Sequence, residues 1–289
     1  MLMKPVREAF VTAGEVKLHC VQWGEQGTPV ICIHGLTANA FYFQATAEAL
    51  AREHRVFAYD LRGRGESDRP EHGYNVPIHA EDLARLIDAL GLERPVIFGH
   101  SLGAFIALYF AAHYPDRLSK LILGDGGATL PWQRFEDQPA WLTAAISRLG
   151  TSVPSFEAYL QRLKAAPFLG PYWNAYIDTY FQHDVLQQSD GSVVSRCYQA
   201  GVLEEGLISD KAKPEEQWAQ VRVPTLLLRA GQGMLTADDQ LLTEAATATI
   251  CQAIKGIQFV NFPSLNHYTI LFGIEPGPLQ TIRAFIEEA

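Results

Sequence analysis

The sequence predicts an α/β fold with a doubly wound, mostly parallel sheet and a helical segment inserted after the sixth strand. Short apolar runs alternate with helix-like segments over residues 28–125, a pattern typical of parallel strands joined by helices. The alternation stops after Asp125 and resumes at Val221. The 289 residues are enough for one such domain with an insertion.

The elements of the first part follow one another closely. Strands are predicted over residues 7–12, 16–23, 28–33, 55–60, 95–99 and 118–124. Helices are predicted over residues 38–54, 78–90 and 102–113. The run TPVICI at residues 28–33 is nearly all apolar, as expected for a strand buried on both faces.

The middle of the chain has a different character. Residues 127–220 are rich in aromatic side chains and are divided by prolines into short helical pieces. We predict that they form a helical cap inserted into a core made of residues 1–126 and 221–289. In the second part of that core, strands are predicted over 221–229 and 256–262, and helices over 236–250 and 278–288.

Composition and charge exclude several function classes. Hydrophobic residues make up 48% of the chain and charged residues 19%, as in globular proteins. The net charge of −9 argues against a nucleic-acid partner, because no basic surface could replace phosphate counterions. No apolar run suffices for a signal peptide or a transmembrane helix. We expect a cytoplasmic monomer or homodimer with no membrane partner.

Two further absences concern bound groups and disulfides. The sequence shows no glycine-rich phosphate loop and no metal-type spacing of His and Asp, so no cofactor and no metal are expected. The four cysteines are scattered, and free buried thiols are the favoured interpretation over disulfides.

Gly99-His100-Ser101-Leu102-Gly103 is a G-x-S-x-G motif between a predicted strand and a predicted helix. A serine on such a tight turn projects its hydroxyl at the carboxyl edge of the sheet, and the flanking glycines tolerate the crowding. The backbone N–H of Leu102 would point at a developing oxyanion. We predict that Ser101 is a nucleophile. The alternative is an ordinary turn whose serine caps the helix.

Two more motifs accompany this one. His34-Gly35 directly follows the strand at 28–33, and residues 60–70 (DLRGRGESDRP) contain the pattern D-x-R-G-x-G-x-S. In this order, and with G-H-S-L-G, these motifs resemble those of the α/β-hydrolase family over the whole chain. The resemblance implies a serine hydrolase with a helical cap and carboxylesterase-like or lactonase-like activity. It does not name a substrate, because this fold hosts many chemistries.

The resemblance also implies roles for the first loops. The second oxyanion donor should be the backbone N–H of Leu36, acting together with that of Leu102. His34 is interpreted as a structural residue that holds this loop. Arg62 and Arg64 are interpreted as members of structural salt bridges rather than as contacts to an anionic substrate.

The catalytic base should lie late in the chain, because the family order is nucleophile, acid, histidine. Asn266-His267-Tyr268 follows the last predicted strand after a short loop. His267 is therefore the predicted base, which would take the Ser101 proton and return it to the leaving group.

The acid has two candidates. The commonest family pattern places an aspartate shortly after the seventh strand, but Gly and Met occupy residues 233–234. Asp238 comes later, in the predicted first turn of a helix that Thr236 would cap. Some family members carry the acid after the sixth strand, where Asp125 stands. We favour Asp125 over Asp238 as the partner of His267.

The aromatic insertion is expected to cover the nucleophile and to supply an apolar pocket. The residues predicted in this pocket are Gly35, His100, Trp132, Trp141 and Tyr268. The first hypothesis is cleavage of carboxylic esters of small to medium apolar substrates through an acyl-enzyme. Cleavage of amide or carbon–carbon bonds by the same residues is a second hypothesis, and a non-catalytic ligand receptor of this fold is a third.

Overall fold

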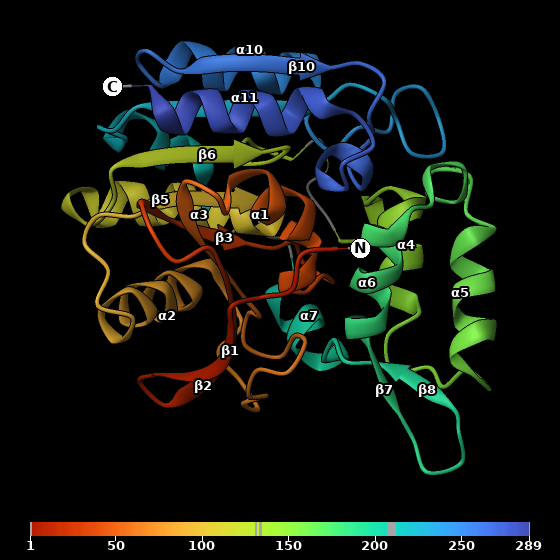
Figure 1. Ribbon diagram of the computed structural model, residues 1–289. Coiled ribbons are helices and arrows are strands. Elements are labelled where there is room, and N and C mark those ends of the chain that lie inside the picture. Colours follow the sequence, from red (N-terminus) through yellow and green to blue (C-terminus); the bar gives the residue numbers. More distant parts are fainter. Residues whose placement is uncertain (1, 131, 133–134, 207–211, 289) are drawn as a thin grey trace.

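The computed structural model describes residues 2–130, 132, 135–206 and 212–288, and eight strands of this part form one central sheet (Figure 1). The strands are β1 (Arg7–Ala13), β2 (Val16–Trp23), β3 (Thr28–Ile33), β4 (His54–Tyr59), β5 (Val96–His100), β6 (Lys120–Gly124), β9 (Thr225–Ala230) and β10 (Gln258–Phe262). Their order is β1-β2-β4-β3-β5-β6-β9-β10. Among these strands β2 pairs antiparallel with β1 and with β4, and the other five pairings are parallel, so the predicted mostly parallel sheet is confirmed.

Helices cover both faces of the sheet. The helices of the core are α1 (Gln44–Leu50), α2 (Val76–Ala89), α3 (Leu102–His113), α10 (Glu244–Ala253) and α11 (Pro276–Glu287). Side chains of α2, α3 and α10 share one hydrophobic core, and side chains of α1 and α11 share another. In β3, Ile31 and Ile33 enter the first core, whereas Val30 and Cys32 enter the second. The alternation of a strand's side chains thus explains why this run is apolar on both faces.

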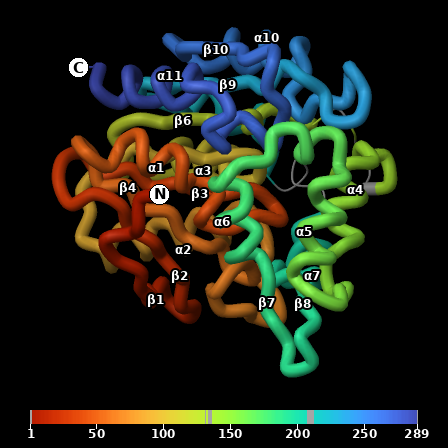
Figure 2. Tube along the Cα trace, turned by 45° about the vertical axis from the view of Figure 1, so that its right-hand side comes forward, coloured from red at the N-terminus to blue at the C-terminus, as the bar shows by residue number. Residues whose placement is uncertain are grey.

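The segment that joins β6 to β9 forms the cap. It contains α4 (Ala140–Ser147), α5 (Phe156–Lys164), α6 (Ala175–Asp184), α7 (Gln199–Glu205), α9 (Pro214–Gln217) and a hairpin of β7 (Val185–Gln187) and β8 (Val193–Ser195). In Figure 1 the arrowhead of β6 points toward the cap, and Figure 2 again shows α4, α5 and the hairpin on that side. The helical insertion is confirmed. The hairpin was not predicted, because three-residue strands are too short to show a periodic pattern.

Short 3-10 helices complete the described structure. They span Ala40–Phe43, Pro115–Arg117, Phe135–Asp137, Gly170–Tyr172, Trp218–Gln220 and Thr269–Leu271. The predicted helix over 38–54 is therefore a 3-10 turn capped by Asn39, followed by α1, and it ends at Leu50.

The predicted helix over 236–250 is wrong at its start. The carboxylate of Asp239 accepts hydrogen bonds from the backbone N–H groups of Met234, Leu235 and Thr236, at 2.6, 2.9 and 3.2 Å. These bonds hold the chain in a turn, since a short carboxylate competes well for nearby backbone donors. The helix begins only at Glu244, where the Thr243 hydroxyl accepts the N–H of Ala246 as the N-cap.

All four cysteines of the chain are free thiols. Cys20, Cys32 and Cys197 are buried free thiols, and the free thiol of Cys251 is half-buried. Buried thiols act as small apolar core residues. Within the described residues, no helix combines the length and the hydropathy needed to cross a bilayer.

Candidate active site

Ser101 stands on a sharp turn between β5 and α3. Its backbone has φ +56° and ψ −121°, in the left-handed half of φ space that a serine seldom adopts. The two glycines of the motif permit the close packing around it. A Cβ on Gly99 would lie 1.9 Å from the carbonyl oxygen of Gly103, and a Cβ on Gly103 would lie 2.0 Å from that of Ile33. No other residue type fits either position.

A small cavity of about 40 Å³ opens in front of Ser101. Both Ser101 and His267 line it. Of the predicted pocket residues, four line the same cavity: Gly35, His100, Trp141 and Tyr268. The fifth, Trp132, lines an adjoining cavity of about 20 Å³ together with Ser101. The structure thus places all five of these residues in the walls of the two cavities that Ser101 lines.

His267 and Asp125 form a buried hydrogen-bonded pair. Nδ1 of His267 lies 2.6 Å from Oδ2 of Asp125, and the other carboxylate oxygen accepts the N–H of Ala230 at 2.9 Å. Asp125 is 1% exposed and has φ +44°, so its side chain is fixed by the turn that follows β6. Asp238, the alternative acid, is exposed on the loop after β9. The structure brings Asp125, and not Asp238, to His267.

A set of hydrogen bonds holds the loop that carries His267. The side-chain oxygen of Asn266 accepts the N–H groups of Tyr268 and Thr269, both at 3.0 Å. The Tyr42 hydroxyl donates to the carbonyl oxygen of Tyr268 at 3.1 Å. Nε2 of His100 lies 3.0 Å from the carbonyl oxygen of His267. The position of the imidazole is therefore set by groups from three separate parts of the chain. Nothing in the sequence pattern singled out Tyr42.

The two predicted oxyanion donors lie on either side of Ser101. Leu102 is the first residue of α3, so its N–H belongs to the first turn, where no intrahelical acceptor exists. Leu36 lines the cavity and follows Gly35, where an added Cβ would lie 3.1 Å from Cβ of Ser101. The loop after β3 thus lies directly against the serine, which is where a developing oxyanion would need a donor.

His34 holds the loop after β3 in place through two hydrogen bonds, which is the structural role predicted for it. Its Nδ1–H donates to the carbonyl oxygen of Gly35 at 2.8 Å, and its Nε2 accepts the N–H of Leu61 at 3.0 Å. This pattern requires the neutral imidazole. Burial lowers the pKa of His34 to about 4, from an ordinary value of 6.5.

Acid is expected to destabilise the protein through His34. Between pH 6.5 and about 4 the unfolded chain binds a proton at this residue that the folded chain does not, so stability falls as the pH falls. The full shift corresponds to about 3 kcal/mol. Thermal unfolding at pH 7 and at pH 4.5 measures the loss. His34→Gln, which cannot titrate, should lose less stability over that range, and an equal loss in the variant would contradict the assignment.

Arg64 supports the same loop through a buried ion pair with the cap. Its Nε–H donates to the carbonyl oxygen of Leu36 at 3.1 Å, and its guanidinium pairs with Glu205 of α7. Nε2 of His79 lies 2.7 Å from the same carboxylate. Burial by itself raises the pKa of a carboxyl, but Arg64 and His79 outweigh it and hold the pKa of Glu205 at about 2. Arg62 is bonded twice to Asp82, both at 2.7 Å, so both arginines are structural as predicted.

Arg64→Ala is expected to lower the free energy of unfolding by about 3–5 kcal/mol, because it leaves Glu205 buried without its cation. Urea unfolding measures the loss. Arg283→Ala is the matched control, since that arginine pairs with Glu53 and Glu287 at the surface, where such pairs contribute about 0–1 kcal/mol. Similar losses in the two variants would contradict the importance of burial at Arg64.

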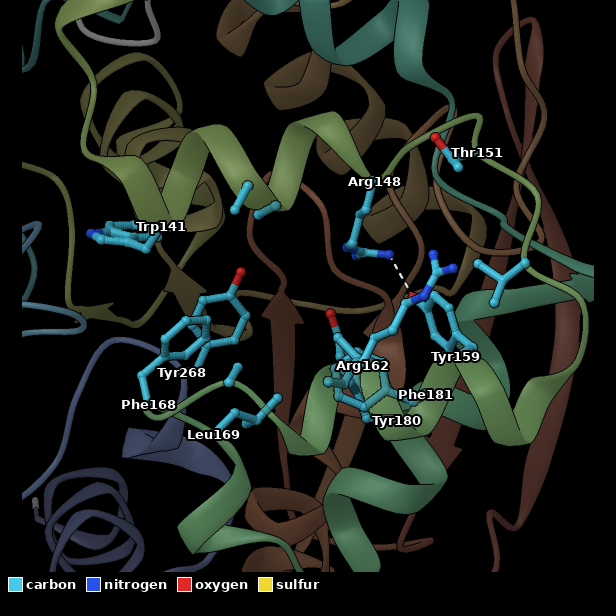
Figure 3. Close-up of a pocket in the computed structure, with 15 residues that line it drawn as sticks. Trp141, Arg148, Thr151, Tyr159, Arg162, Phe168, Leu169, Tyr180, Phe181 and Tyr268 are labelled. Atoms are coloured by element: carbon cyan, nitrogen blue, oxygen red, sulfur yellow. Dashed lines mark hydrogen bonds between the residues drawn. The ribbon is translucent and has the colours of Figure 1, made fainter.

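A larger cavity of about 250 Å³ lies inside the cap (Figure 3). It shares three wall residues with the Ser101 cavity: Trp141, Tyr180 and Tyr268. Arg148, Arg162 and Tyr159 also line it. These three residues were not predicted in the pocket, because Arg148 follows α4, the other two lie on α5, and the three share no motif. Most of the remaining wall is aliphatic or aromatic.

Comparisons with known proteins agree with this architecture. A family model described as the alpha/beta hydrolase fold matches residues 28–274. The chain is 28% identical to 2-(acetamidomethylene)succinate hydrolase of Mesorhizobium japonicum over 262 residues, which cover 89% of this chain and 87% of that protein. It is 31% identical to cis-3-alkyl-4-alkyloxetan-2-one decarboxylase of Shewanella oneidensis over 247 residues, which cover 77% of this chain and 72% of that protein.

A solved structure gives the same result for the fold. The crystal structure of E-2-(acetamidomethylene)succinate hydrolase has a TM-score of 0.82, covering 98% of this chain and 99% of that chain at 23% identity. The stretch that the family model matches begins at β3 and includes Ser101, Asp125, the cap and His267. The chain belongs to the α/β hydrolase fold family.

Proposed function

We propose that this protein hydrolyses carboxylic esters of small to medium, mainly apolar substrates through an acyl-enzyme on Ser101. The observation that carries the proposal is the buried Asp125–His267 pair, whose imidazole lines the same cavity as the Ser101 hydroxyl. With Nδ1–H donating to Asp125, Nε2 of His267 is left as the acceptor. This is the tautomer that a general base requires.

The proposed reaction has two halves. Nε2 of His267 takes the proton of the Ser101 hydroxyl while the oxygen attacks the ester carbonyl carbon, and the N–H groups of Leu36 and Leu102 stabilise the oxyanion. The tetrahedral intermediate collapses to the acyl-enzyme, and the alcohol leaves with the proton from His267. A water molecule then attacks the acyl group, gives its proton to His267, and Ser101 regains a proton as the acid departs.

The Ser101 hydroxyl makes no hydrogen bond to His267 among the described residues. Catalytic hydrogen bonds are often long without substrate and tighten in the substrate complex. The proposal therefore expects this bond to form when an acyl group occupies the cavity.

Amide hydrolysis is a second candidate, and it is supported by a relative. The protein of Mesorhizobium japonicum is named for a substrate with an acetamido group. The same residues would act, but His267 would have to protonate an amine, which is a poorer leaving group than an alcohol. The relatives support hydrolysis as the general activity, and the bond that is cleaved remains a proposal.

Two measurements test the proposal. A fluorophosphonate probe should label the protein, and mass spectrometry should find the label on the peptide that contains Ser101. Turnover of an ester and an amide with the same acyl group then decides the bond through the ratio of their kcat/KM values. A larger kcat/KM for the amide would favour the second candidate. Tight ligand binding without labelling would favour a non-catalytic receptor and overturn both.

A further inference from the structure

The cavity inside the cap has an unusual charge for this protein. The whole chain carries a net charge of −9, but two arginines and no acidic residue line this cavity. The rest of its wall is mainly apolar, including Leu163, Phe168 and Phe181. Positive charge in an apolar cavity is costly unless something offsets it. The hydrogen-bond and ion-pair partners of each arginine decide whether its charge is offset.

Arg148 has one partner of opposite charge. Its Nη1 lies 2.8 Å from a carboxylate oxygen of Asp184 and 2.6 Å from the Tyr159 hydroxyl, and its Nη2 donates to the carbonyl oxygen of Thr37 at 3.3 Å. Asp184 thus offsets the charge of Arg148. A guanidinium has five N–H donors, so two of them, on Nε and Nη2, are not used by these bonds.

Arg162 has no such partner. It lies on α5 at an exposed position of the cavity wall, and among the described residues no hydrogen bond or ion pair is made by its guanidinium. In Figure 3 the side chains of Arg148 and Arg162 both extend toward Tyr159. Two arginines line this cavity and one carboxylate, Asp184, pairs with one of them, so the positive charge of the exposed Arg162 is not offset in the cavity wall.

The cavity inside the cap adjoins the Ser101 cavity. Trp141, Tyr180 and Tyr268 line both this cavity and the Ser101 cavity. Thr37, whose carbonyl oxygen accepts from Arg148, also lines the Ser101 cavity. A molecule bound at Ser101 could therefore extend past these aromatic residues to the two arginines.

We propose that the cap cavity binds a carboxylate on the substrate, so that the preferred substrate is an acyl group with an apolar middle and an anionic far end. The proposal rests on the function proposed above, and it names the substrate class of the same site. Arg162 supplies the unpaired charge, and the free donors of Arg148 supply further hydrogen bonds to the carboxylate. The apolar wall between them and Ser101 contacts the methylene groups. Guanidinium groups suit this task because their forked donors match the two oxygens of a carboxylate.

A matched pair of substrates tests the inference. Mono-4-nitrophenyl adipate carries a free carboxylate at the far end of its acyl chain, and methyl 4-nitrophenyl adipate carries the same chain with that charge removed. Wild-type protein should release nitrophenolate from the anionic ester with a kcat/KM about tenfold or more above that for the neutral ester. A ratio near one would overturn the inference and leave ester hydrolysis intact.

Arg162→Gln should remove most of this preference, because it should lower kcat/KM for the anionic ester much more than kcat/KM for the neutral ester. Lys164→Gln is the matched control, because it removes the same charge from the same helix while Lys164 lies over the ring of Trp173, outside the cavity wall. It should keep the preference. An equal fall in both variants would show a general effect of surface charge and would overturn the inference.

A binding measurement separates this inference from the proposed reaction. In a Ser101→Ala background, monomethyl adipate should bind more tightly than dimethyl adipate by isothermal titration calorimetry, and the added change Arg162→Gln should abolish the difference. If neither nitrophenyl ester is turned over but the binding difference is found, the proposed reaction fails and the carboxylate site stands. Equal binding of the monoester and the diester overturns the carboxylate site, whatever the turnover. Arg148→Lys, which keeps a cation beside Asp184, should weaken the binding of the monoester more than that of the diester.

Discussion

Ser101→Ala is expected to reduce kcat for ester hydrolysis by about a millionfold, the scale for loss of a serine nucleophile. The alanine methyl group leaves no atom that can attack the carbonyl carbon, so only the oxyanion donors and substrate binding would still act. The fold should be retained. Alanine tolerates φ +56° no worse than serine does, and the hydroxyl makes no hydrogen bond among the described residues that would be lost. Initial rates with a nitrophenyl ester, together with a melting temperature, measure both quantities.

Ser189→Ala is the control for this variant, because Ser189 is exposed in the hairpin of the cap. It should leave both the rate and the melting temperature unchanged. A Ser101→Ala protein that folds normally and keeps more than about one hundredth of the wild-type rate would contradict nucleophilic attack by Ser101. If the melting temperature of Ser101→Ala were much lower than that of the wild type, Ser101→Cys would be measured in its place. That variant retains a nucleophilic atom at the same strained position.

Where the sequence predicted the site well, the signal was local. Each of the motifs at His34-Gly35 and Gly99–Gly103 directly follows a short apolar strand, so the position of its side chains is set within a few residues of chain. The contacts that require glycine at 99 and 103 explain why the motif is so specific: the strand and the helix after it are packed too closely for any Cβ. Local sterics therefore explain why the turn that carries Ser101, the predicted nucleophile, could be recognised from the sequence.

The acid that partners His267 was harder to predict from the sequence, because an aspartate follows each of two neighbouring strands at the same edge of the sheet. β6 and β9 are adjacent and parallel, so residues after either strand lie near His267. What decides between them is the conformation of each turn. Asp125 takes φ +44° directly after β6 and turns its carboxylate to the imidazole, whereas the loop after β9 is folded around the carboxylate of Asp239. Turn conformations of this kind depend on tertiary hydrogen bonds and have no periodic pattern in the sequence.

The polar groups inside the cap could not be predicted from the sequence. Arg148, Tyr159 and Asp184 are bonded to one another, but they come from the end of α4, from α5 and from the end of α6. Their separations in the sequence reflect the packing of short helices against one another. No spacing rule connects such residues, and the aromatic composition of the segment indicated only that it was apolar. The proposal of an anionic substrate therefore rests on the structure of the cap and not on the sequence pattern.

Asp125→Asn is expected to lower kcat by about ten thousandfold, the scale for loss of the triad carboxylate. The asparagine amide can donate to Nδ1 of His267, which would place the proton on Nε2 and leave no acceptor for the Ser101 hydroxyl. The amide oxygen can still accept the N–H of Ala230, so the turn after β6 should be preserved. Steady-state kinetics with a nitrophenyl ester measure the effect, and Asp238→Asn is the control because Asp238 is exposed. A damaging Asp238→Asn with a mild Asp125→Asn would reverse the assignment of the acid.

The double variant Ser101→Ala/Asp125→Asn shows whether the carboxylate acts through the serine. If Asp125 serves only to hold the tautomer of His267, and His267 serves only to move the Ser101 proton, the second change has nothing left to impair. The double variant should then be no slower than Ser101→Ala alone, although the two single effects multiplied would be far larger. A further loss of about ten thousandfold in the double variant would mean that Asp125 acts independently of Ser101, for instance on substrate binding. A neutral result, by contrast, would tie the buried pair after β6 to the serine on the turn after β5 as one catalytic unit.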